Sequence, residues 1–70
     1  MDNPLIFQAL LIVDHGSMRK EANLLLEDVA DLLRTQKPGQ IVHIAHMELA
    51  EPTIGQGLAA CIHDGATEVL

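Results

Sequence analysis

The feature that most constrains the fold of this chain is an almost unbroken apolar run, Leu5–Val13 (LIFQALLIV). The run is rich in branched side chains and lacks the apolar–polar alternation of a half-exposed strand. Such a run is typical of a strand that is buried on both faces of a parallel sheet. It ends in Asp14-His15-Gly16, a turn signal. We therefore predict that the chain begins with a buried strand and then turns sharply.

A helix is predicted after this turn. Ser17 stands where an N-cap residue would be, and Pro38-Gly39 ends the pattern. Between them, apolar residues recur at the i, i+3, i+4, i+7 spacing of one helix face, while charged residues take the other face. The apolar positions are Ala22, Leu25, Leu26, Val29, Leu32 and Leu33.

The remaining chain predicts a second strand, a second helix and the start of a third strand. The strand covers Ile41–Leu49, and Pro52 stands at the first helical position, where its missing N–H is no loss. Asp64-Gly65 ends the helix, and Ala66–Leu70 begins the third strand. The order β-α-β-α-β implies parallel strands joined by right-handed crossovers. One face of the second helix is apolar: Ile54, Leu58, Cys61 and Ile62.

Seventy residues with two helices and two and a half strands form a small parallel-sheet half-domain. A parallel sheet needs helices on both faces, and we expect two helices to be too few for this. The last residues, Val69-Leu70, fall in the middle of the third strand. We therefore expect residues 1–70 to be part of a longer chain or to complete themselves by self-association, since an uncovered apolar edge attracts partners.

Charge and composition exclude several classes of function. Ten acidic and four basic side chains give a net charge of −6, whereas a nucleic-acid partner requires a basic surface. A single Phe without Trp or Tyr provides no stacking platform for bases. Patterned apolar residues, 49% of the chain, argue against disorder. The lone Cys61, the absence of a signal-peptide pattern and the absence of a bilayer-length apolar stretch predict a cytoplasmic protein without a membrane partner.

Two ionisable residues stand at predicted strand ends, where ligands bind in open α/β sheets. His15 follows the first strand, and Glu48 lies at the end of the second. Neighbouring parallel strands are about 4.8 Å apart, so both side chains can face one crevice. An imidazole and a carboxylate together suit a divalent metal or proton transfer. Spacing alone leaves the simpler alternative open, in which His15 stabilises a turn and Glu48 is solvated.

Two motifs at these strand ends resemble a known family. Leu11–Ser17 (LIVDHGS) is similar to the first strand and His-Gly-Ser loop of the class II chelatases of sirohydrochlorin and cobalamin biosynthesis, the CbiX and SirB group. Met47–Ile54 (MELAEPTI) resembles the Glu-Leu-x-Glu-Pro-[Ser/Thr]-Ile motif of the same family. Cys61 and Gly65-Ala66-Thr67 also fit common forms of it. The resemblance covers nearly the whole chain, as an N-terminal part of such a domain with a flavodoxin-like or chelatase-like fold.

The resemblance implies a lyase that inserts a divalent metal into sirohydrochlorin, a tetrapyrrole, without ATP or an organic cofactor. The metal, Co²⁺, Fe²⁺ or Ni²⁺, is a substrate, and the product belongs to siroheme or cobalamin biosynthesis. The family's matching His binds metal and accepts pyrrole protons, so that role would fall on His15. The matching Glu contributes to the metal site, and that role would fall on Glu48.

The family carries another active-site His on a loop after the third strand, and this sequence ends before that loop. Three hypotheses follow. The chain is a sirohydrochlorin chelatase; or it is a metal- or tetrapyrrole-binding module that self-associates, for example as a dimer, without turnover; or it is an inactive fragment of a longer chelatase.

The Gly16-Ser17 turn at a helix start predicts an anion contact through backbone N–H groups. The implied substrate is a polycarboxylate, so one of its acid groups is the expected ligand, assisted by Arg19 and Lys20. Simple solvation of these two basic residues is an equally good interpretation.

The other candidate residues favour structural roles. His43 and His46 lie three apart and so point to opposite faces of their strand; we expect His43 to be half-buried and His46 to serve packing or an interface. His63 suits the C-terminus of the second helix, and we expect Glu51 to cap the N-terminus of that helix rather than bind a metal. Cys61 lies on an apolar stripe. A hydrolase triad of adjacent loop residues and a histidine-phosphatase site, in which Asp14 would replace the arginine that binds phosphate, are both rejected.

Overall fold

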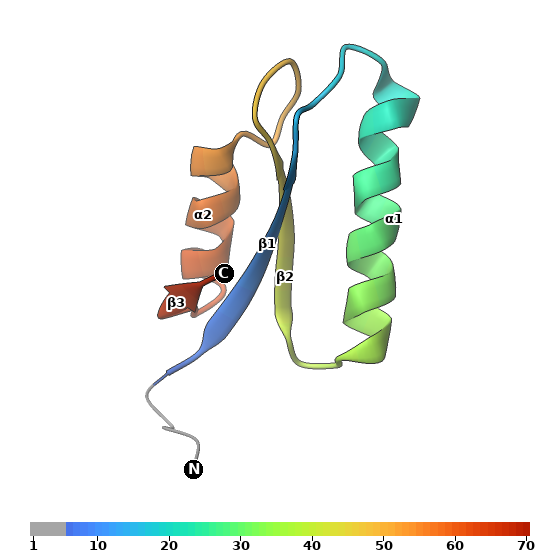
Figure 1. Cartoon of the computed structure of the whole chain (residues 1–70). Coiled ribbons are helices and arrows are strands. Elements are labelled where there is room, and N and C mark those ends of the chain that lie inside the picture. The colour runs from blue at the N-terminus through green and yellow to red at the C-terminus, as the bar shows by residue number, and fades with distance from the viewer. Residues whose placement is uncertain (1–5) are drawn as a thin grey trace.

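A computed structural model of the chain describes residues 6–70 as a three-stranded parallel sheet with one helix packed on each face (Figure 1). The strand order is β2-β1-β3, so β1 is the central strand. This confirms the predicted α/β class and the order β-α-β-α-β. The elements are β1 (Gln8–Asp14), α1 (Lys20–Gln36), β2 (Ile41–His46), α2 (Ile54–His63) and β3 (Glu68–Val69).

The two crossovers run in opposite directions across the sheet: α1 joins β1 to β2, and α2 joins β2 to β3 on the far side of β1. Crossovers of one hand that run in opposite directions place their helices on opposite faces of the sheet, as Figure 1 shows. The expectation that two helices cannot serve both faces was therefore wrong, since each face has one. The cover is thin, however. Val13 of β1 is 41% exposed, so the prediction of a fully buried first strand was also wrong.

On the α1 side, the core is a cluster of Ala30, Val42 and Ile44, all buried. Leu10 and Ile12 of β1 and Leu26 and Leu33 of α1 pack against this cluster. Only part of the apolar face predicted for α1 contributes to it, since Leu25, Val29 and Leu32 are 65%, 48% and 58% exposed. A single narrow sheet is too small to cover the whole stripe.

On the α2 side, close packing depends on Gly57, which is buried. A Cβ atom at this position would lie 2.7 Å from Leu11 Cδ1 and 3.0 Å from the carbonyl oxygen of Ile44. The missing side chain thus lets the helix backbone rest directly on β1 and β2. Cys61, one turn further along α2, is fully buried, which confirms its predicted place on the apolar stripe. No helix within residues 6–70 combines the length and the apolarity that a membrane span requires.

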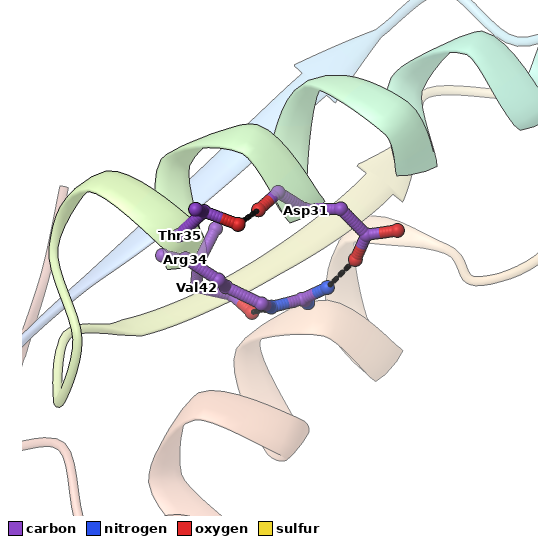
Figure 2. A network of polar contacts seen from close by, with 4 residues as sticks. All are labelled: Asp31, Arg34, Thr35 and Val42. Carbon is purple, nitrogen blue, oxygen red and sulfur yellow. Dashed lines mark hydrogen bonds and ion pairs between the residues drawn. The ribbon is translucent and has the colours of Figure 1, made fainter.

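The outer edge of β2 is covered by a side chain from α1 (Figure 2). Arg34 donates to the carbonyl oxygen of Val42 through Nη2 at 2.6 Å and through Nε at 3.2 Å, and Nη1 binds Asp31 Oδ1 at 2.9 Å. The arginine therefore satisfies a carbonyl of an edge strand in the described sheet, where pairing with another chain would otherwise be open. Sequence spacing assigned Arg34 only to the solvent face of the helix.

Two element boundaries differ from prediction at the carboxyl ends of the strands. β2 ends at His46 and not at Leu49, which has a φ of +69° and so cannot continue a strand. Ser17 is not the N-cap of α1, because Arg19 occupies that position without a side-chain cap. Ser17 Oγ instead accepts a hydrogen bond from the Arg19 N–H at 3.0 Å. Leu5, the predicted start of the first strand, lies outside the described residues.

The start of α2 also differs. Pro52, in a cis peptide with Glu51, precedes the helix and is not its first residue. The N-cap is Thr53, whose side chain accepts from the Gln56 N–H while the Gln56 side chain accepts from the Thr53 N–H. This reciprocal capping box satisfies two backbone donors at the helix start, the N–H groups of Thr53 and Gln56. The prediction that Glu51 caps this helix was wrong; its carboxylate accepts from Gln56 Nε2 at 3.3 Å.

Candidate functional site

The candidate site lies where β1 and β2 end side by side. Asp14 and His46 are partners in the last register position of the two strands. Backbone pairing continues beyond them, because the Met47 N–H donates to the Asp14 carbonyl at 2.9 Å and the Glu48 N–H donates to the His15 carbonyl at 3.1 Å. The two residues predicted as metal ligands are therefore joined through their main chains at one edge of the sheet.

Gly16 makes this junction possible. Its φ is +88°, and a Cβ atom there would lie 1.8 Å from the carbonyl oxygen of Glu48 and 3.1 Å from His46 Cβ. Both the left-handed backbone and the lack of space restrict the position to glycine. The His-Gly-Ser and Glu-Leu segments, far apart in the sequence, thus pack against each other as one unit.

The side chains of both His15 and Glu48 are exposed, as an incoming ligand would require. Within residues 6–70 there is no group of three or more His, Cys, Asp or Glu side chains placed to hold a metal ion. The predicted metal site therefore still depends on two residues, His15 with its imidazole and Glu48 with its carboxylate. Such a set leaves most positions of a divalent cation open to another ligand.

Asn23 holds the end of the His-Gly-Ser loop in place. Its Nδ2 donates to the Ser17 carbonyl at 2.7 Å, and its Oδ1 accepts from the Ser17 N–H at 2.9 Å. The anion contact predicted for the Ser17 N–H would have to replace this second bond. Arg19, expected to assist such a contact, pairs with Glu21 at 3.1 Å on the surface.

A cavity of about 300 Å³ opens beside the junction, between α1, the end of β2 and the loop that follows it. Neither His15 nor Glu48 lines it. Basic, acidic and apolar groups all contribute to its wall: Lys20, Asn23, Leu24, Glu27, Ile44, His46, Glu51 and Pro52. Asn23 holds the His-Gly-Ser loop, and Glu51 belongs to the loop that follows β2. A molecule bound in the cavity would therefore contact residues that hold or form these two loops.

Sequence reasoning missed the pairing of His46 with Asp14. His46 Nδ1 lies 2.5 Å from Asp14 Oδ1, and the imidazole is 1% exposed. The burial agrees with the packing role expected for His46. The sequence suggests for Asp14 only a hydrolase triad or a phosphatase site, both of which are rejected above. The signal in the sequence was their position, since Asp14 stands directly before His15 and His46 two residues before Glu48.

The remaining histidines lie away from the junction. His43 is half-buried, as predicted, and its Nε2 lies 2.7 Å from Asp64 Oδ2 at the end of α2. His63 occupies the last turn of α2, where a positive charge is favourable. Burial, and secondarily the charge of Asp64, raises the pKa of the Cys61 thiol, so Cys61 is a poor nucleophile and metal ligand.

Comparison with known proteins gives matches over most of the chain. The CbiX family model matches residues 9–70, which include both loops of the junction. This chain belongs to the CbiX family. It is 44% identical over 61 residues to a chloroplastic sirohydrochlorin ferrochelatase of Arabidopsis thaliana, and 35% identical over 63 residues to a sirohydrochlorin cobaltochelatase of Methanocaldococcus jannaschii. Its fold matches that of SirB from Bacillus subtilis, solved with Fe³⁺, with a TM-score of 0.78 and 34% identity.

The CbiX-family chain corresponds to only part of these relatives. The alignments cover 87% and 90% of this chain, but 27% of the Arabidopsis protein and 44% of the Methanocaldococcus protein. The structural match covers 91% of this chain and 25% of SirB. The relatives thus contain a large part that has no counterpart in these seventy residues.

Proposed function

We propose that this CbiX-family chain takes part in the insertion of a divalent metal into sirohydrochlorin or a closely related tetrapyrrole. The observation that carries the proposal is the junction at the carboxyl ends of β1 and β2, where the Glu48 N–H donates to the His15 carbonyl. It presents an imidazole and a carboxylate from two neighbouring strand ends. Family membership and the names of the relatives support the same reaction.

The chemistry requires both groups. Metalation of a tetrapyrrole exchanges two pyrrole N–H protons for one M²⁺ ion, so the site must deliver a cation and accept protons. In our proposal Glu48 and the neutral His15 ring bind the incoming metal. As the metal moves to the ring nitrogens, His15 accepts one of the two pyrrole protons and the released Glu48 carboxylate accepts the other, and both protons then pass to water. Co²⁺, Fe²⁺ and Ni²⁺ all suit this ligand set, and metal availability would select among them.

The Gly16-Ser17 turn is our proposed contact for a carboxylate of the substrate. Lys20, at the start of α1, supports this because it adds a positive charge next to the turn and lines the cavity. The carboxylate would take the Ser17 N–H from Asn23 Oδ1, which leaves Asn23 free to hold the Ser17 carbonyl alone.

We further propose that residues 1–70 represent one part of a longer or self-associated chelatase domain in a reducing compartment such as the cytoplasm. The small share of each relative that the chain covers supports the first point. Leu25 and Ile62, each 65% exposed, leave apolar surface on both helices for a second copy, such as a homodimer. The free, buried Cys61 is compatible with a reducing compartment.

The test follows the absorbance of sirohydrochlorin during incubation with Co²⁺ and the protein. We expect metalation faster than the uncatalysed rate, and a loss of about 10²-fold or more of this acceleration in His15→Ala, the range for a positioned acid–base group. Glu48→Gln keeps the shape but removes the charge, and should weaken Co²⁺ binding in calorimetry. His63→Ala, an exposed histidine away from the junction, is the matched control and should change neither.

No acceleration by the wild-type chain would reject catalysis by these seventy residues. If Co²⁺ still binds and His15→Ala weakens the binding, the chain is a binding module without turnover. If His15→Ala leaves the isotherm unchanged, His15 is not a ligand.

A further inference from the structure

The buried pair of Asp14 and His46 lies directly behind the proposed site. The two residues form the last register pair of β1 and β2, and His46 Nδ1 lies 2.5 Å from Asp14 Oδ1. Beyond this pair, two main-chain hydrogen bonds join the segments that carry His15 and Glu48, from the Met47 N–H to the Asp14 carbonyl and from the Glu48 N–H to the His15 carbonyl. A bond between the last side chains of two strands can therefore control how far those segments separate.

The surroundings of His46 make this bond strong. The ring is 1% exposed, whereas Asp14 is 37% exposed. A hydrogen bond with a charged partner gains strength when one side is shielded from water, and a buried imidazole without its partner is costly. Gly16 packs against His46 as well, since a Cβ atom at position 16 would lie 3.1 Å from His46 Cβ. The pair thus contacts the His-Gly-Ser loop through His46, and it holds the end of β2 next to the end of β1, just before Glu48.

We propose that Asp14 and His46 are positioning residues that set the separation of the His15 and Glu48 loops. Neither needs to touch metal or tetrapyrrole. They act by holding two strand ends at one spacing, so that the two proposed ligands reach the same cation. The effect on metal binding rests on the proposed function, while the effect on the loops does not.

The variant His46→Phe distinguishes a positioning role of the His46–Asp14 bond from a role of His46 in packing alone. His46→Phe fills the same buried space but cannot bind Asp14. His46→Asn has a smaller side chain, yet its Nδ2 can donate to Asp14 from near the place of the imidazole Nδ1. The matched control is His43→Phe, which breaks the second His–Asp pair of β2 on the opposite face of the sheet.

The first measurement is amide hydrogen exchange without metal. In His46→Phe we expect the Met47 and Glu48 amides to exchange about tenfold faster or more, the factor that corresponds to loss of a charge-assisted hydrogen bond. The Leu11 and Leu70 amides, which donate to the Leu70 carbonyl at 2.8 Å and to the Ala9 carbonyl at 2.9 Å on the other side of β1, serve as internal references and should keep their protection. His46→Asn should restore most of the protection, and His43→Phe should leave both loop amides unchanged.

The second measurement is calorimetric titration with Co²⁺. We expect the Kd to rise about tenfold in His46→Phe, at the low end of the effect of groups that orient metal ligands, and to recover in His46→Asn. Unchanged exchange of the Met47 and Glu48 amides in His46→Phe would overturn the positioning role, as would an equal loss of protection across the whole sheet. If wild-type protein binds no Co²⁺, the proposed function fails, and hydrogen exchange still decides whether the pair holds the loops.

Discussion

At the carboxyl ends of the strands, His46 binds Asp14 while buried, and Gly16 adopts its positive φ against the Glu48 carbonyl. Nearer the amino ends, the same kinds of residue occur in open surroundings. His43 binds Asp64 with side chains 28% and 47% exposed, and Gly39 has a φ of +89° with nothing within 4 Å of an added Cβ. Identical chemical groups are thus packed tightly at one end of the sheet and loosely at the other.

This contrast shows that residue type alone does not reveal a role. A His–Asp pair in water contributes little to stability, because solvent and salt screen it. A shielded pair between two strand ends restricts the backbone that carries the adjacent loops. Tight packing at the carboxyl ends is therefore the physical property that distinguishes the candidate site, and substitutions at both ends can test it.

The largest difference is expected between the two glycines. Gly16→Ala would force a Cβ atom to 1.8 Å from a carbonyl oxygen, so the loop must move and the protein should lose about 4 kcal/mol or more, or fail to fold. Gly39→Ala has open space and meets only the cost of a left-handed backbone, about 1–2 kcal/mol. Urea denaturation measures both. Equal losses would mean that the junction is not tightly packed.

The histidines should differ next. His46→Ala empties a buried site and leaves Asp14 without its partner, so we expect a loss of about 2–4 kcal/mol in the free energy of unfolding. His43→Ala should cost less than about 1 kcal/mol, since its ion pair is half-exposed. Denaturation in low and high NaCl sharpens the comparison, because salt should reduce only the contribution of His43. A salt-sensitive contribution from His46 would contradict its shielding.

A smaller contrast of the same kind exists within α2. Gly57→Ala would bring Cβ to 2.7 Å from Leu11 Cδ1, and overpacking of this sort costs about 1–3 kcal/mol. Gly55→Ala, with only Thr53 Oγ1 at 4.0 Å, should stabilise the helix by about 0.5–1 kcal/mol. Opposite shifts of the thermal midpoint are expected. Two shifts of one sign would show that α2 does not lie as close to the sheet as described.

The smallest effect concerns pH. Burial, followed by the charge of Asp64, raises the pKa of Cys61 above its ordinary value of 9.0. As pH rises above that value, the unfolded chain loses the thiol proton while the folded chain retains it, so stability falls. The difference in urea midpoint between wild type and Cys61→Ala should therefore change between pH 8 and pH 10 in favour of the variant. A constant difference would indicate that the thiol is not shielded.

The order of the elements could be predicted from sequence because it depends on local signals. The apolar run before Asp14, the helical spacing before Pro38 and the turn at Asp64-Gly65 each act within a few residues. The element ends were less predictable. β2 stops at His46 because the chain must bend to meet Gly16, and that contact joins residues about thirty positions apart.

The candidate site was predictable in part for the same reason. Placing His15 and Glu48 at strand ends needed only the pattern of strands and helices. The spacing of His43 and His46 also indicated correctly that they face opposite sides of the sheet. The partner of His46 could not be found in this way, because it depends on the register between β1 and β2, which no local pattern specifies.

The central place of β1 has a consequence for how the chain folds. Pairing of β1 with β2 joins residues 32 positions apart, as in Ala9 with Ile41, whereas pairing with β3 joins Ala9 with Val69, 60 positions apart. Closing the longer loop costs more entropy, and the two-residue strand β3 returns little for it. We therefore expect the β1–α1–β2 unit to assemble first in refolding, with the carboxyl-end junction already formed, and β3 to join last.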